Sequence, residues 1–260
     1  MGDVVELSFL QMIAAYVFVV ILLLIVRARG ISREKEILVS SIRMTIQLIL
    51  VGYILVYLLD NKNPFYTIMV IVIMEAFAIH NIFKRTKEQI STPLKKTIAA
   101  SMVIGTLSSL LYFLFIVINI SPWYDPQYFI PIAGMLIGNS MTGISLGVTR
   151  LVDGMTKQKH MVESALMLGA TPKMASKDIV DKAFDSAILP TINSMVGMGI
   201  VFLPGMMTGQ ILSGVSPVLS IKYQIAIMLG IVGSVSLTVI LFLHFGYKTF
   251  FNDSSQMLVD

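Results

Sequence analysis

The sequence predicts an all-α, polytopic membrane protein with about seven transmembrane helices, its N-terminus outside and its C-terminus in the cytosol. The first observation behind this prediction is the composition: 56% of the residues are hydrophobic, only 13% are charged, and the mean hydropathy is +0.83. An ordinary soluble domain carries about a quarter charged residues, so roughly half the usual charge is missing. This composition excludes water-soluble globular enzymes and disordered proteins.

The second observation is a series of apolar stretches, each long enough to cross the ~30 Å hydrocarbon core as a helix. Asp3 and Glu6 precede the first stretch, where a secretory signal peptide carries Lys or Arg, so we expect this stretch to stay in the mature chain. The stretches predict one transmembrane domain over residues 1–260. They lie near 6–26, 37–59, 65–83, 97–118, 128–149, 187–212 and 223–245.

The third observation is the distribution of Lys and Arg. Sixteen of them follow the first, third and fifth stretches or lie in the C-terminal tail, whereas the opposite side holds only Lys62 and Lys222. Because cytosolic loops are the ones enriched in Lys and Arg, this asymmetry sets the predicted orientation. The basic residues are divided among short loops, so the net charge of +4 does not indicate nucleic-acid binding.

Two absences exclude further classes of protein. The chain has no cysteine, which excludes disulfide scaffolds, zinc fingers, iron–sulfur clusters and thiol catalysis. It also lacks the G-x-x-x-x-G-K-[ST] pattern, so it does not bind ATP through a P-loop. We therefore expect no catalytic residue and no cofactor in this chain, and any energy must come from a partner.

The longest loop, at about residues 150–186, lies on the predicted cytosolic side. It predicts two short helices, Lys157–Leu168 and Pro172–Ala187, broken between Gly169 and Pro172, with Thr171 as the N-cap of the second. Lys and Asp alternate at i,i+4 in the second helix, which predicts one solvated face opposite an apolar one. Such a helical loop is a candidate docking site for a soluble partner; the alternative is a helix lying on the bilayer surface.

Small residues mark the fifth stretch. Two G-x-x-x-G units let helix backbones approach closely in lipid. The motif alone does not separate a contact between two copies of the chain from packing within one chain. The four glycines are Gly134, Gly138, Gly143 and Gly147, and Asn139, Ser140 and Thr142 lie between the units.

Ionisable and amide side chains inside the second and third stretches form the first candidate site. Arg43 and Gln47 lie ~9 and ~15 Å deep from the cytosolic end, and Glu75 lies ~12 Å deep, so the three can meet. Charged groups in lipid are costly and indicate function by default. Glu75 and His80 are the candidate metal ligands. The alternatives are that Arg43 snorkels to the interface and that His80 is an ordinary packed residue.

The sixth stretch is interrupted at Pro204-Gly205, ~24 Å from Ile188. The interruption predicts a simple kink or the outer gate of a substrate pathway. The chain's 18 methionines suit a soft metal ion, although Met is also common filler in helix cores. Besides Arg43, Gln47 and Glu75, the candidate pathway residues are Asn193, Met195, Met198, Pro204, Gly205, Met206, Met207, Thr208, Gly209 and Gln210.

The run from Glu163 to Gly169, followed by Leu189-Pro190, resembles the EAA loop of ABC permeases. In that family the loop forms the coupling helix that the ATPase subunit receives. This sequence departs from the pattern by Ser164 in place of the middle Ala and by a longer interval before Leu189-Pro190. The resemblance implies the ATPase-coupling residues Glu163, Ser164, Ala165, Gly169, Ala170, Thr171 and Pro172.

Residues 189–194, 203–214 and 223–225 are similar to the FetB-type iron-export ABC permeases, a family related to plant aluminium-tolerance half-transporters. The resemblance covers nearly the whole chain. It implies a permease homodimer in the lipid of the bacterial cell membrane and a separate cytosolic ATPase that binds ATP and Mg. It also implies export of iron or another divalent metal ion. The alternatives are a passive metal channel, a scaffold that recruits a cytosolic regulator, or an ABC permease for an organic substrate.

Overall fold

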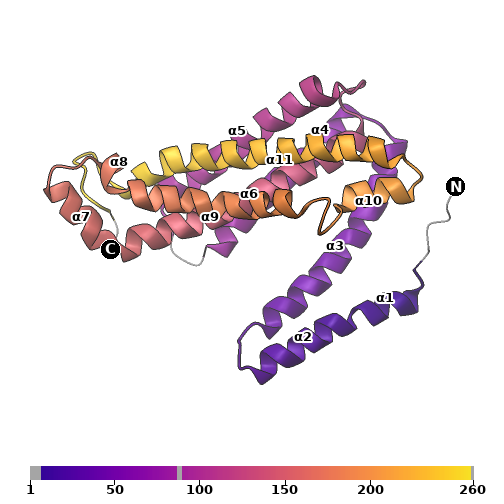
Figure 1. Ribbon diagram of the computed structural model, residues 1–260, viewed down its shortest axis with the longest axis horizontal. Helices are drawn as coiled ribbons and strands as arrows, with labels where there is room; N and C mark the ends of the chain where they lie inside the picture. The colour runs from indigo at the N-terminus through magenta and orange to yellow at the C-terminus, as the bar shows by residue number, and fades with distance from the viewer. Residues whose placement is uncertain (1–6, 87–89, 259–260) are drawn as a thin grey trace. The chain divides into compact units, whose positions relative to one another are not determined.

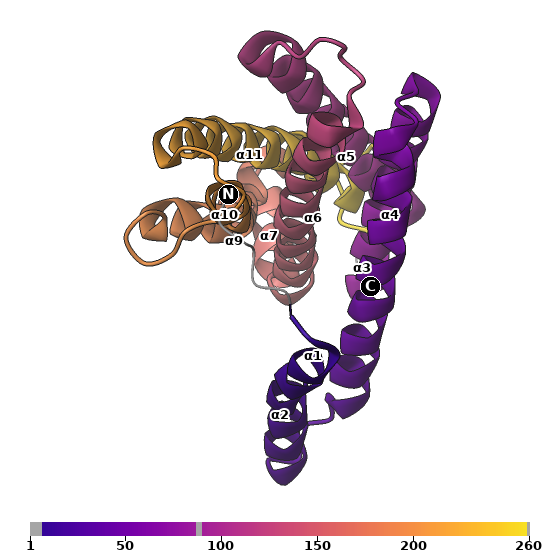
Figure 2. The ribbon, with the colours of Figure 1, turned by 90° about the vertical axis from the view of Figure 1, so that its right-hand side faces the viewer.

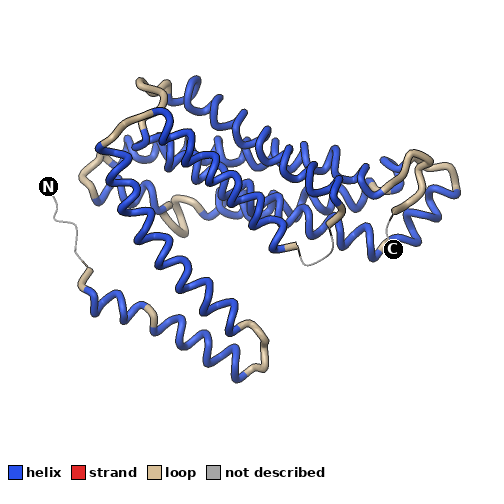
Figure 3. The backbone as a smooth tube through the Cα atoms, turned by 180° about the vertical axis from the view of Figure 1, so that it is seen from behind, coloured by secondary structure: helices blue, strands red, loops and turns tan. Residues whose placement is uncertain are grey.

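The computed structural model describes residues 7–86 and 90–258, so Asp3, Glu6 and the first residue of the predicted span 6–26 lie outside the described part. Within it the chain is almost entirely helical, and the helices are joined by short loops (Figure 3). The chain divides into two compact units, which we describe separately. Unit 1 is Met1–Lys62 with Leu212–Gly214, and unit 2 is Asn63–Ile211 with Val215–Asp260.

Unit 1 is built from α1 (Phe9–Ala15), α2 (Val17–Ala28) and α3 (Glu34–Asp60). A capping box between Ser8 and Gln11 begins α1. The side chains of Tyr16 and Thr45 form a hydrogen bond between the start of α2 and α3. Most side chains of α2 and α3 are exposed, and the exposed ones are mainly aliphatic, as expected of helices surrounded by lipid.

Unit 2 holds the other long helices (Figure 1). Three of them begin in the same way, because Asn63, Ser91 and Asp125 each accept a backbone N–H bond and a proline occupies the first or second helical position. The long helices are α4 (Pro64–Arg85), α5 (Thr92–Tyr112) with η1 (Phe113–Ile118), α6 (Pro126–Lys157), α9 (Lys177–Gly197) and α11 (Pro217–Gly246), which η2 (Tyr247–Phe250) follows.

Helix α6 is central to unit 2, lying between α4 and α9 (Figure 2) and also packing against α11. Its glycines allow this. A Cβ atom at Gly143 would lie 2.8 Å from Cγ1 of Val235 and 3.3 Å from the carbonyl oxygen of Ala187. Gly147 approaches Ala187 in the same way. Packing within one chain therefore accounts for this half of the G-x-x-x-G pattern.

The described residues contain six helices that are long and apolar enough to cross a membrane. The difference from seven lies in the predicted stretch 187–212, which is not one helix. Helix α9 ends at Gly197, residues 198–204 are irregular, and α10 (Gly205–Leu212) follows; the break is visible in Figure 3. Gly199 has a φ of +83°, so the helix already stops before Pro204, whose missing N–H could not continue it.

The chain is therefore a multi-pass, all-helical membrane protein, whereas its orientation stays a prediction. One boundary differs clearly from the expectation. Helix α6 continues to Lys157 instead of ending near 149, so the loop expected from residue 150 starts with two more helical turns. Asp153 and Lys157 form an i,i+4 ion pair of 3.1 Å in this extension, which keeps polar residues helical outside the apolar segment.

Candidate functional site

The predicted break in the long loop is present. Helix α7 (Lys159–Met167) ends in two hydrogen bonds: the N–H of Ala170 donates to the carbonyl of Ala165 at 3.0 Å, and that of Gly169 to Leu166 at 2.9 Å. This pair of bonds defines a Schellman motif, which needs a left-handed residue after the helix. Gly169 supplies it with a φ of +90°. The turn is therefore a fixed structure.

The next helix begins as expected. The Thr171 side chain accepts a hydrogen bond from the N–H of Met174 at 3.3 Å, and Pro172 is the first residue of α8 (Pro172–Ala175). The predicted single helix 172–187 is instead divided at Ser176. The Ser176 hydroxyl donates to the carbonyl of Pro172 at 2.7 Å, a bond that competes with regular helix geometry. Helix α9 then starts at Lys177.

The motif residues of α7 face two ways. Glu163 is half-buried and lies 3.8 Å from Nδ1 of His160. Ser164, which replaces the usual Ala, donates its hydroxyl to the carbonyl of His160 at 2.7 Å and so satisfies its own polar group within the helix. Ser164 is exposed, whereas Ala165 is half-buried. The substitution therefore disturbs neither the helix nor its packing.

Two residues that the sequence analysis did not select are the most exposed large hydrophobic side chains of this segment. Met167 is 87% exposed and Leu168 90% exposed at the end of α7, immediately before Gly169. Large apolar side chains on a solvated turn indicate a contact surface. The signal was readable in the sequence: two apolar residues directly before a helix-stopping glycine, in a loop outside the apolar stretches.

The start of α9 is solvated on one face, as predicted. Lys177 pairs with Asp181 at 2.5 Å and Lys182 with Asp178 at 2.6 Å. The hydrogen bond to Asp181 raises the pKa of Lys177. The opposite face buries Ile179 against α6. A cavity of about 640 Å³ lies between α8, this part of α9 and the end of α11.

Glu75 is buried in unit 2, where it contacts α5. The Thr106 hydroxyl donates a hydrogen bond to its Oε1, while Oε2 has no hydrogen-bond partner among the described residues. A second buried polar contact joins α6 to α11, where the hydroxyls of Ser140 and Ser234 are hydrogen-bonded at 3.0 Å. Ionisable and polar groups cost free energy inside a membrane unless they are paired, and they commonly mark functional sites.

The other residues predicted to lie near Glu75 divide between the two units. Arg43 and Gln47 are exposed on α3 in unit 1, so their meeting with Glu75 stays a prediction. His80 is exposed on α4, about 140° around the helix from Glu75. The described residues contain no group of three His, Cys, Asp or Glu side chains that could hold a metal ion, so the metal role of Glu75 and His80 also stays a prediction.

The predicted pathway residues divide between two elements. Asn193 and Met195 are exposed on α9, and Met207 is buried on α10. The Met198 sulfur accepts a hydrogen bond from Nε2 of Gln224 on α11 at 3.7 Å. The carbonyl of Pro204, at the start of α10, accepts bonds from both the N–H and the hydroxyl of Thr208. Gly205, Met206, Gly209 and Gln210 lie on α10.

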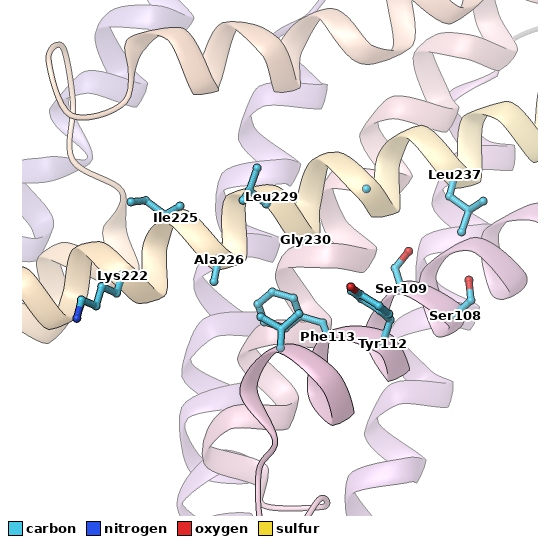
Figure 4. Close-up of a pocket in the computed structure, with 12 residues that line it drawn as sticks. Ser108, Ser109, Tyr112, Phe113, Lys222, Ile225, Ala226, Leu229, Gly230 and Leu237 are labelled. Atoms are coloured by element: carbon cyan, nitrogen blue, oxygen red, sulfur yellow. The ribbon is translucent and has the colours of Figure 1, made fainter.

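A groove of about 720 Å³ lies between the α5–η1 segment and α11 (Figure 4). Phe113 and Gly230 both line it, and they are in close contact, since a Cβ atom at Gly230 would lie 2.8 Å from the Phe113 ring. Its other walls include Leu229 and Leu237, and Lys222 stands at one end. None of the residues selected from the sequence lines it. We therefore assign the groove to the outer, apolar surface of the helix bundle.

Comparisons with known proteins identify relatives along nearly the whole chain. The chain is 33% identical to the probable iron export permease protein FetB of Escherichia coli (strain K12), over 94% of this chain and 93% of the relative. It is 33% identical to the protein ALUMINUM SENSITIVE 3 of Arabidopsis thaliana, over 94% and 88%. It is 31% identical to the membrane protein YjkA of Bacillus subtilis (strain 168), over 96% and 98%.

No solved structure matches the chain. The family whose description reads "Uncharacterised protein family (UPF0014)" matches residues 9–251. The match includes every candidate site residue described above. The chain belongs to the UPF0014 family of membrane proteins.

Proposed function

We propose that this chain is the permease subunit of an ABC transporter that exports iron or another divalent metal ion from the cytosol. A separate ATPase subunit binds ATP and Mg and supplies the energy, and two copies of the permease form the transport path. The observation that carries the proposal is the exposed turn between α7 and α8, with Met167 and Leu168 at its tip. This turn has the motif, the fixed geometry and the apolar surface of a coupling element.

The connections of the turn explain how it would act. Only Gln158 separates α7 from α6, and α8 is separated from α9 by Ser176 alone. Helices α6 and α9 in turn pack along each other in unit 2. A displacement of the turn by a partner would therefore move two adjacent membrane helices directly.

The metal cargo rests on chemistry and on a relative. The buried Glu75 carboxylate and the methionines of α9 and α10 are groups that bind divalent or soft metal ions. The relative from Escherichia coli is named a probable iron export permease. Both support the metal proposal over an organic substrate. Since metal ions carry charge, their passage also requires polar groups inside the membrane.

Binding to the ATPase tests the proposal. We expect Leu168→Asp to weaken co-purification of a co-expressed ABC ATPase by about tenfold or more, because an apolar anchor would become a charge. Leu258→Asp is the matched control, since Leu258 is 60% exposed but lies outside the turn. Unchanged thermal unfolding of both variants would show that the fold is intact. Normal ATPase binding by Leu168→Asp would contradict the coupling role.

A further inference from the structure

Three asparagines in unit 2 lie on adjacent helices at exposed or half-exposed positions. Asn81 is half-buried on α4, and Asn139 on α6 and Asn193 on α9 are exposed. We call these three residues the asparagine layer. Only Asn193 was selected from the sequence as a pathway residue. The other two lie on helices that follow it in the bundle, since α6 packs against α9 on one side and against α4 on the other (Figure 2).

The contacts between helices place the three residues at one depth. Asn81 Nδ2 donates to the Met141 sulfur at 3.4 Å, and Met141 is two residues, about 3 Å, from Asn139. Helices α6 and α9 are antiparallel, with Ala187 opposite Gly143. Counted outward from this contact, Asn139 is about 6 Å away along α6 and Asn193 about 9 Å along α9. All three amides thus lie within a few ångströms of the same level.

This level is inside the hydrocarbon. On α6, Asn139 is about 16 Å from Arg150 and about 21 Å from Asp125, the nearest charged residues on either side. A hydrocarbon core of about 30 Å therefore includes Asn139. The amides have few partners at this depth. Asn139 Nδ2 donates to the Met135 carbonyl of its own helix at 2.7 Å, and Asn193 forms no side-chain hydrogen bond among the described residues.

The outer faces of α5 and α11 show what lipid exposure selects in this chain. The exposed residues there include the aliphatic Ile104, Leu229 and Leu237, and the exposed Ser108 of α5 returns its hydroxyl to the carbonyl of Ile104. The exposed face of α6 carries Leu146 but also an amide, that of Asn139, and the half-buried Thr142, whose hydroxyl bonds back to the Gly138 carbonyl. An amide that faces lipid without a hydrogen-bond partner costs free energy, and the exposed Asn193 has none among the described residues, which favours an aqueous surrounding over lipid at this level.

We propose that the asparagine layer lines the aqueous path of the transporter and faces the same layer of a second copy of the chain. The inference rests on the proposed transport function and names a site for its cargo. Amide carbonyl oxygens are neutral, hard ligands that replace part of the water shell of a divalent cation without trapping it. The six amides of two copies would complete a ring that one copy cannot form. Passage rather than storage requires such weak ligands.

Thiol accessibility tests the aqueous environment, and the natural absence of cysteine makes single variants simple. We expect Asn139→Cys and Asn193→Cys, in the full chain in native membranes, to react with a water-soluble thiol reagent about tenfold faster than controls, because only hydrated thiols ionise. Leu229→Cys and Ile104→Cys are the controls, since both positions are exposed on apolar faces. Equal rates in all four variants would overturn the proposal.

Oxidative cross-linking tests the second copy. Asn139→Cys is expected to form a disulfide-linked dimer, whereas Leu229→Cys is not. The competing outcome is a disulfide within one chain, between Asn139→Cys and a second cysteine placed at Met44 on α3. That disulfide would show that α3 of the same chain covers the face, and it would overturn the two-copy arrangement. These assays need no transport, so their outcome is independent of whether the proposed function holds.

Metal transport in vesicles completes the test, with Fe²⁺ and Mn²⁺ as probes. We expect Asn139→Leu to raise the half-saturating metal concentration or lower the rate by about tenfold, because the oxygen ligand is lost. Asn139→Gln, which keeps the amide, should retain most activity. Unchanged transport by Asn139→Leu would remove the ligand role. Failure of the unmodified protein to move either ion, with the accessibility pattern intact, would instead contradict the proposed metal cargo.

Discussion

Helices α1, α2 and α3 of unit 1, which we call the hairpin, and helix α6 of unit 2 all belong to candidate membrane spans, but they differ in hydropathy and in burial. Of the six candidate spans, Phe9–Ala28 has the highest mean hydropathy and Pro126–Lys157 the lowest. Burial runs the other way, with 6% of the first span buried and 56% of the second. The most apolar span is therefore one of the two least buried, together with Glu34–Asp60.

The difference follows from the solvent. Lipid is as apolar as a leucine side chain, so hydrophobicity alone gives helices no reason to associate. Close packing through small residues and polar contacts does, and α6 has both, in Gly143, Gly147 and the Ser140–Ser234 hydrogen bond. The hairpin, whose exposed side chains are mainly aliphatic, is suited to lipid. Hydropathy alone does not give the order of burial: Pro217–Phe250 has the second-highest mean hydropathy of the six candidate spans and is 44% buried, whereas Glu34–Asp60 is less apolar and only 6% buried. The packing contacts of α6, and not its low hydropathy, account for its place at the centre of the bundle.

A pair of glycine substitutions would break this comparison most directly. Gly143→Leu on α6 should destabilise the protein by several kcal/mol or prevent folding, since its Cβ atom alone would lie 2.8 Å from Val235. Gly52→Leu on α3 should have little effect, because nothing lies within 4 Å of a Cβ atom there. Thermal unfolding and size-exclusion chromatography in detergent measure both. Equal stability of the two variants would refute the contrast between the helices.

The buried carboxylate sharpens the comparison, because it lies in the packed unit and not in the hairpin. Glu75→Gln keeps the shape and the hydrogen bond from Thr106 but removes the charge. We expect transport to fall about tenfold or more with little change in unfolding temperature. Thr106→Val is the control, since it removes the hydrogen bond and keeps the carboxylate. If Thr106→Val lowers transport while Glu75→Gln transports normally, the role of this contact is structural.

Local features of the site were predictable from the sequence. Gly169 and Thr171 determine their turn through bonds to residues within five positions, so the sequence alone contains the information. The position at which the stretch 187–212 is interrupted was not predictable. Helix α9 already ends at Gly197, well before Pro204, which marked the expected break. Hydropathy does not distinguish a continuous span from two shorter helices separated by an irregular apolar segment.

Relations between helices were less predictable than the helices themselves. Depth along a helix can be counted, and counting placed Arg43 and Glu75 at one level, but it does not give the face of each helix. Glu75 is directed to Thr106 on α5, and His80 faces away from it. The sequence likewise showed four glycines in the predicted stretch 128–149 without revealing that Gly143 and Gly147 are used within the chain.

Gly138 offers the finest test, because a Cβ atom at Gly134 would already lie 3.2 Å from the Met74 side chain of the same chain. A Cβ atom at Gly138 would meet nothing within 4 Å, and Gly138 is next to Asn139, about 100° around α6 from it. Gly138→Leu should therefore leave the unfolding temperature of the monomer nearly unchanged. It should weaken a dimer whose backbones approach at this face, by about 1 kcal/mol or more.

The measurement is the fraction of dimer against protein-to-detergent ratio, with the ATPase co-expressed, and Gly52→Leu serves as the control. Gly52 is equally open but lies on α3 of unit 1. A dimer weakened only by Gly138→Leu would assign this face of α6 to contact between copies, beside the asparagine layer. An undiminished dimer would place the contact elsewhere and confine the glycines of α6 to packing within one chain, since Gly143 and Gly147 are already occupied there.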